Sequence, residues 1–121
     1  MAVFEIDGKE YELKLTYAGV RRLNNAFEGG AYEVIGKALS GDLDAFPVIV
    51  HAALIHTGEN FTQKKVDAQI EKMFEEGALT FEDITKLSDK VVTKSGFFAP
   101  TVEKMAKKNP ELKKALDQLR D

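Results

Sequence analysis

A short stretch of alternating residues near the amino-terminal end constrains the fold of this chain more than any other feature. Residues 10–15 alternate between apolar and polar side chains, which predicts a strand with one buried and one solvated face. The apolar face consists of Tyr11, Leu13 and Leu15. Asp7-Gly8, typical of a tight hairpin turn, separates this run from residues 3–6. Because an isolated hairpin is only marginally stable in water, we expect its apolar face to lie on helices, docked through Val3 or Phe4 together with the second strand.

The chain after Thr16 has the spacing of apolar residues that is typical of helices. Capping residues, glycines and prolines divide it into segments at residues 17–27, 31–39, 44–57, 62–77, 80–95 and 100–119. Asn109-Pro110 divides the last segment, since a residue before proline avoids the helical region. The predicted fold class is mainly α, with an N-terminal β-hairpin packed on a bundle of about five to seven helices. We expect a single domain over 1–121, with the hairpin at 3–15 and the helical region at 16–121.

The third helical segment is the candidate for the centre of the core. Asp42 or Asp44 caps it, and Pro47 falls in its first turn, where a missing N–H group costs little. Its side chains are apolar on nearly every face, which is typical of a helix that is buried on most sides. The apolar residues are Phe46, Val48, Ile49, Val50, Ala52, Ala53, Leu54 and Ile55.

The composition offers little for catalysis or metal binding. The chain has no cysteine, and its two histidines, His51 and His56, are five residues apart, which places them on different helix faces. Asp42 and Asp44 resemble the start of a calcium loop, but the required later glycine and acid are absent. We therefore expect no catalytic residues, no cofactor and no metal, and the protein is predicted not to be an enzyme.

Charge and hydropathy argue against two further classes of partner. The formal net charge is −3, and the basic candidates, Arg21-Arg22 and the lysines of residues 104–114, lack interleaved exposed aromatic residues. Nucleic acid is therefore an improbable partner on sequence grounds. The longest apolar stretch, residues 45–55, is shorter than the roughly 20 residues that a membrane span needs, so no membrane partner is expected.

Apolar residues in the C-terminal half are the candidates for binding a protein partner. Phe97 and Phe98 follow the helix break at Gly96, where two adjacent aromatic side chains cannot easily face one core. Either one packs while the other covers a helix end, or one anchors a partner. The helical stripes are narrow enough to be shared between the core and a partner helix. The stripe residues are Ile84, Leu87, Val91, Leu112, Leu116 and Leu119.

Several motifs along the chain resemble one protein family, the tail assembly chaperones of long-tailed phages and prophages of Gram-positive bacteria. The motifs are Ile6-Asp7-Gly8-Lys9-Glu10-Tyr11, Tyr17-Ala18-Gly19-Val20-Arg21-Arg22-Leu23-Asn24, Gly41-Asp42-Leu43-Asp44-Ala45-Phe46-Pro47, His51-Ala52-Ala53-Leu54-Ile55-His56 and Lys107-Lys108-Asn109-Pro110-Glu111-Leu112-Lys113-Lys114-Ala115-Leu116. The resemblance extends over almost the whole chain and includes no active-site motif.

The resemblance implies a non-catalytic helper that acts while the virion is built. Such a protein binds the tape measure protein, helps recruit tail tube subunits, works in the host bacterial cytoplasm and is absent from the mature virion. Many members are also made as a longer, frameshifted form. Two alternatives stay open from the residues alone: another small phage structural or connector protein, and a small nucleic-acid-binding regulator that uses Arg21-Arg22 or the lysine-rich end.

Overall fold

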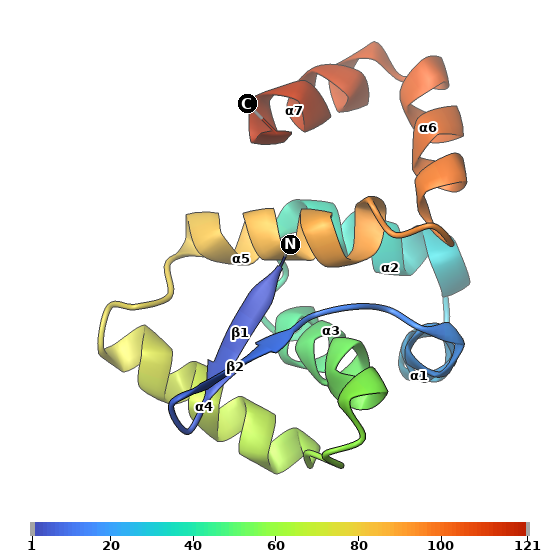
Figure 1. The fold of residues 1–121 in the computed structure, drawn as a ribbon. Helices are drawn as coiled ribbons and strands as arrows, with labels where there is room; N and C mark the ends of the chain where they lie inside the picture. The colour runs from blue at the N-terminus through green and yellow to red at the C-terminus, as the bar shows by residue number, and fades with distance from the viewer. Residues whose placement is uncertain (1, 121) are drawn as a thin grey trace.

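The computed structural model describes residues 2–120 and begins with the predicted hairpin (Figure 1). Strands β1 (Val3–Ile6) and β2 (Lys9–Glu12) pair antiparallel, with Phe4 opposite Tyr11. Asp7 and Gly8 both have positive φ, 51° and 81°, as a tight hairpin turn requires. The second strand is shorter than expected. It ends at Glu12 because the Lys14 N–H leaves the hairpin and donates to the carbonyl of Ala53, 3.0 Å away.

The rest of the described chain consists of helices joined by short loops, so the predicted class, mainly α with an N-terminal hairpin, is confirmed. The helices are α1 (Tyr17–Ala26), α2 (Gly30–Ser40), α3 (Ala45–Leu54), the 3₁₀ turn η1 (Ile55–Thr57), α4 (Gln63–Glu75), α5 (Phe81–Ser88), the π-helical turn η2 (Asp89–Thr93), α6 (Ala99–Lys108) and α7 (Pro110–Arg120). The predicted break at Asn109-Pro110 separates α6 from α7.

Helix α3 lies at the centre, as its all-round apolar sequence predicts (Figure 1). Helices α1 and α4 pack against it, and the hairpin lies across it through β2. Helices α2 and α5 lie side by side, and α6 and α7 are beyond them at the top of the view. Most of α3 is buried, namely Ala45, Phe46, Ile49, Val50, Ala52, Ala53 and Leu54.

The hairpin docks through its apolar face. Of the two candidates on the first strand, Phe4 is buried and Val3 is exposed. Leu13 is buried with Phe4, whereas Tyr11 and Leu15 are partly buried at the margin. The Tyr11 ring meets Phe61 edge-on, with ring centroids 5.1 Å apart, so the hairpin also contacts the segment that leads into α4.

The segment predicted as one continuous helix over residues 80–95 is divided. Thr80 and Asp83 form the predicted capping box, in which each side chain accepts a hydrogen bond from the other's backbone N–H. The α-helix then widens into a π turn at Asp89. A π turn is a rare single-turn widening inside an α-helix, and the periodicity of this segment does not reveal it, because the apolar residues on either side keep a helical spacing.

No single helix within residues 2–120 is long and apolar enough to cross a membrane. Only α2 combined with α3 and η1 reaches that length and apolarity, and the two parts are bent by 110° relative to each other.

Candidate functional site

The two adjacent phenylalanines have different surroundings in the structure. Phe98 is buried, while Phe97 is 62% exposed. Their rings meet edge-on, with an interplanar angle of 90° and centroids 5.0 Å apart. Phe98 therefore belongs to the core and supports Phe97, which remains accessible to a partner.

Most of the other predicted partner-binding residues are used inside the molecule. Ile84, Val91 and Leu116 are buried in the core, and Leu87, Leu112 and Leu119 are partly buried. The stripes are thus occupied by intramolecular packing, and of the predicted side chains only Phe97 is largely exposed. We expected part of each narrow stripe to be left for a partner. In the structure α5, η2, α6 and α7 contact one another, and the stripe side chains are buried or partly buried between them.

Phe97 borders an open apolar groove of about 220 Å³ between α1, the start of α2 and the turn before α6. Tyr17 on α1 lines the same groove and is 78% exposed. The groove is lined by Tyr17, Val20, Arg21, Asn24, Gly30, Ala31, Val34, Phe97 and Phe98. We call it the Tyr17–Phe97 groove. The prediction from sequence did not include Tyr17, because its position at the start of α1, before Ala18, Gly19 and Val20, gives no local sign of whether the ring is buried or exposed.

Close packing of α1 on α3 positions the Tyr17 side of the groove. The Thr16 hydroxyl accepts a hydrogen bond from the Gly19 N–H, 3.4 Å away, and so starts α1. A Cβ atom at Gly19 would lie 2.7 Å from the carbonyl oxygen of Ala52 on α3. Only a glycine permits this close approach, which sets the position of Tyr17 two residues earlier.

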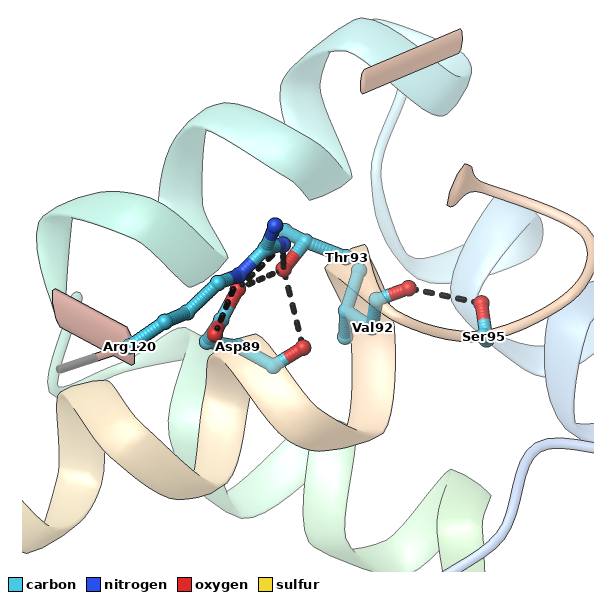
Figure 2. Close-up of polar contacts among 5 residues, drawn as sticks. All are labelled: Asp89, Val92, Thr93, Ser95 and Arg120. Atoms are coloured by element: carbon cyan, nitrogen blue, oxygen red, sulfur yellow. Dashed lines mark hydrogen bonds and ion pairs between the residues drawn. The ribbon is translucent and has the colours of Figure 1, made fainter. Parts of the chain in front are cut away.

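A hydrogen-bonded turn positions the Phe97 side of the groove (Figure 2). The Ser95 hydroxyl donates to the carbonyl of Val92 at 2.6 Å and accepts from the N–H of Phe98 at 3.4 Å. The Ala99 N–H donates to the carbonyl of Ser95 at 2.9 Å. These bonds join the end of η2 to the start of α6, so Phe97 projects from a turn that is held at both ends.

The two arginines predicted as a basic candidate have different roles. Arg21 lines the Tyr17–Phe97 groove. Arg22 instead donates to His51 Nδ1 at 3.3 Å and to Gln63 Oε1 at 3.0 Å. His51 Nε2 in turn donates to the carbonyl of Phe61 at 2.9 Å. Arg22 and His51 therefore connect α1, α3 and the start of α4, and they do not form a shared basic patch with Arg21.

The described residues show no cluster of side chains that could bind a metal ion. Within residues 2–120, no three histidine, cysteine, aspartate or glutamate side chains come close enough together to hold a metal ion. The lining of the Tyr17–Phe97 groove is suited to burying an apolar side chain, since its one charged side chain, Arg21, lies among aromatic and small residues.

A comparison with protein families identifies the group to which the chain is related. The family described as phage tail assembly chaperone protein, TAC, matches residues 3–107. The chain belongs to this family. The match extends from the hairpin through α6, so all residues of the Tyr17–Phe97 groove lie within it. No curated protein and no solved structure matches the chaperone at a significant level.

The family match covers the chain up to α6 and leaves α7 outside it. It ends at residue 107, near the end of α6. Helix α7 nevertheless contacts α5 and α6 and places Leu116 in the core. Helix α7 therefore lies on a surface that belongs to the matched part of the chain.

Proposed function

We propose that this chaperone binds a helical segment of the phage tape measure protein and helps recruit tail tube subunits to it during tail assembly. It does so without catalysis, in the cytoplasm of the host bacterium, and is not kept in the mature virion. The membership of the chain in the tail assembly chaperone family supports the general role.

The observation that carries the proposal is the exposed pair of aromatic rings on the Tyr17–Phe97 groove. Large aromatic side chains at a protein surface supply most of the binding energy in many interfaces. Tyr17 and Phe97 are both more than half exposed and line one apolar depression. An amphipathic helix that lays its apolar face into such a groove is a common recognition mode.

The chemistry expected of the partner agrees with this groove. The family resemblance implies a long, helical tape measure protein, whose apolar stripes need cover before the tail tube surrounds it. The groove lies among α1, α2 and the turn that starts α6, and its lining has a single charged residue, Arg21. A carboxylate beside an apolar stripe of the partner would match Arg21 at the edge of the groove.

Co-expression with the tape measure protein tests the proposal. We expect the wild-type chaperone to keep the tape measure protein in the soluble fraction and to co-purify with it. Phe97→Ala removes the exposed ring and should reduce the recovered complex, because Phe97 is largely outside the core. Phe98 must stay unchanged in this test, since its ring is buried and its removal would disturb folding.

Phe74→Ala is the matched control, because Phe74 is also an exposed phenylalanine but lies on α4 and does not line the groove. The proposal fails if the wild-type chaperone leaves the tape measure protein insoluble. If Phe97→Ala and Phe74→Ala behave alike while both are folded by circular dichroism, the groove is not the binding site. Mass spectrometry of purified virions tests the expected absence of the chaperone.

A further inference from the structure

Helix α7 is held on the chaperone by a narrow contact. Of its eleven residues only Leu116 is buried, and Leu112 and Leu119 are partly buried. These leucines pack toward α5 and α6, which together with η2 form the surface under α7. We call this surface the α7 groove. The pocket at its Arg120 end shares no lining residue with the Tyr17–Phe97 groove.

One ion pair fastens the end of α7 to this groove (Figure 2). Arg120 Nε lies 3.1 Å from Asp89 Oδ2, and Arg120 Nη2 lies 3.0 Å from Asp89 Oδ1. This two-pronged geometry matches a guanidinium group to a carboxylate. Asp89 is on the π turn η2, so the turn presents a carboxylate to the helix that lies above it.

The Asp89 carboxylate is buried, so leaving it without a positively charged partner would be costly in free energy. Its side chain is 3% exposed, against 32% for Arg120. Its local polar partner is Thr93, whose hydroxyl contacts Asp89 Oδ1 and also the Asp89 carbonyl. A hydroxyl has one proton and can donate to only one of these oxygens at a time. A helix without a cation in this place would therefore leave a buried charge poorly compensated.

The pocket at the Arg120 end of the α7 groove favours a single arginine over several neighbouring basic residues. Lys86, Lys90 and Lys94 line the pocket that Asp89 and Arg120 share. These lysines add positive charge around the pocket, which disfavours further cations there, while the ion pair that Asp89 makes within residues 2–120 is the one with Arg120. The planar guanidinium can pair with both carboxylate oxygens at once, whereas an ammonium group cannot.

The α7 groove belongs to the part of the chain that matches the family, whereas α7 itself lies outside the match. Asn109 is the only residue between α6 and α7, and Pro110 prevents the two from joining into one helix. The leucines and the arginine follow a simple spacing, at positions 112, 116, 119 and 120. A helix that fits this groove therefore needs leucines and an arginine at the same spacing.

We propose that the α7 groove is a second docking site, for a partner helix that presents leucines at i, i+4 and i+7 and an arginine at i+8, and that α7 is its resident competitor. The partner helix enters when α7 leaves, and its arginine replaces Arg120 on Asp89. The apparent affinity of the groove for a partner helix is then the intrinsic affinity multiplied by the fraction of molecules in which α7 has left the groove.

Anisotropy titrations with a fluorescent synthetic peptide of residues 109–120 test this in the full-length chaperone. Leu116→Asp should release the resident helix, because it places a charge where Leu116 is buried, while leaving the groove intact. We expect this variant to bind the peptide about tenfold more tightly than wild type, as an emptied groove should. Gln118→Asp is the matched control, since it adds the same charge at an exposed position of α7.

A second peptide, with Arg120→Gln, tests the role of Asp89 without altering the folded protein. It should bind the Leu116→Asp chaperone about tenfold more weakly than the unchanged peptide, because Asp89 loses its charged partner. Full-length Arg120→Gln is a milder way to release α7 and should show intermediate binding of the unchanged peptide.

Four results would overturn the proposal. The first is that the Leu116→Asp and Gln118→Asp chaperones bind the peptide equally well, and the second is that the Leu116→Asp chaperone binds the unchanged and the Arg120→Gln peptides equally well. The third is that both Leu116→Asp and full-length Arg120→Gln lose their fold by circular dichroism. The fourth is that the wild-type chaperone is a dimer that the peptide converts to monomers. The third would show that α7 is an integral part of the core. The fourth would assign the groove to α7 of a second copy. None of these results depends on the tape measure protein.

Discussion

At the scale of single residues, Asp42 begins the central helix. Asp42 Oδ1 accepts hydrogen bonds from the N–H groups of Ala45 at 2.8 Å and Asp44 at 3.0 Å, and Lys37 Nζ lies 3.5 Å from Asp42 Oδ2. The hydrogen bond from Ala45 is the main cause that lowers the pKa of Asp42 below its ordinary value of 3.8; burial opposes it and Lys37 adds to it. Of the two caps predicted for this helix, the Asp42 side chain is the one that caps it.

Asp42→Ala should lower the free energy of unfolding by about 1 kcal/mol, as loss of an N-cap usually does. Because the folded state lowers the pKa of Asp42, this stabilisation is complete above pH 3.8 and is lost as the pH falls further. Urea unfolding of wild type and variant from neutral to acidic pH checks both points. Asp42→Asn keeps an acceptor and should behave nearly like wild type at neutral pH; a loss as large as that of Asp42→Ala would contradict the capping role.

At the scale of elements, the crossing of α1 over α3 depends on a missing side chain. Gly19→Ala would force a Cβ atom to within 2.7 Å of the Ala52 carbonyl oxygen. Since that oxygen belongs to the backbone of a buried helix, we expect a loss of about 1–3 kcal/mol by denaturant unfolding. Weaker binding by the Tyr17–Phe97 groove should accompany it, because α1 carries Tyr17.

Gly36→Ala is the matched control for this change. Gly36 also lies within a helix, α2, but a Cβ atom there would meet open space. Alanine has the higher helix propensity, so this variant should be more stable than wild type by up to about 1 kcal/mol. Equal stability changes at the two glycines would show that close packing at Gly19 is unimportant.

Helix α3 is expected to carry the largest share of the core. Ile49 is 2% exposed, and Ile49→Ala should cost about 2–5 kcal/mol through lost burial and the cavity that remains. Thermal or urea unfolding measures the change. Amide hydrogen exchange provides an independent check, since the N–H groups of α3 should be among the slowest to exchange. If α3 were the least protected helix, its central role would be refuted.

At the scale of the whole molecule, the hairpin is stable because it lies on the helices. Leu13 is 5% exposed, and Leu13→Asp would bury an unpaired charge at this contact. We expect a loss of several kcal/mol in the free energy of unfolding, seen as a lower melting temperature. Lys14→Asp introduces the same side chain at the exposed neighbouring position and should change stability little. An unchanged melting temperature in Leu13→Asp would contradict the observed docking.

Local patterns were sufficient to predict much of the fold. The alternation of residues 10–15 and the Asp7-Gly8 turn predicted the hairpin, and caps, glycines and Asn109-Pro110 predicted the breaks between helices. These signals act within a few residues, through hydrogen bonds and φ values that each residue type permits. The all-round apolar character of α3 likewise predicted its burial, because such a helix has no face suited to water.

Only the tertiary structure decided which apolar and charged residues remain available. Phe97 and Phe98 are adjacent and chemically identical, yet the packing of α6 buries one and exposes the other. The stripes of α5 and α7 have the same spacing whether they cover each other or await a partner, so periodicity could not separate these outcomes. Asp89 and Arg120 are distant in sequence and meet only because α7 folds back over η2. Contacts of this kind depend on the relative placement of whole helices, which no local pattern encodes.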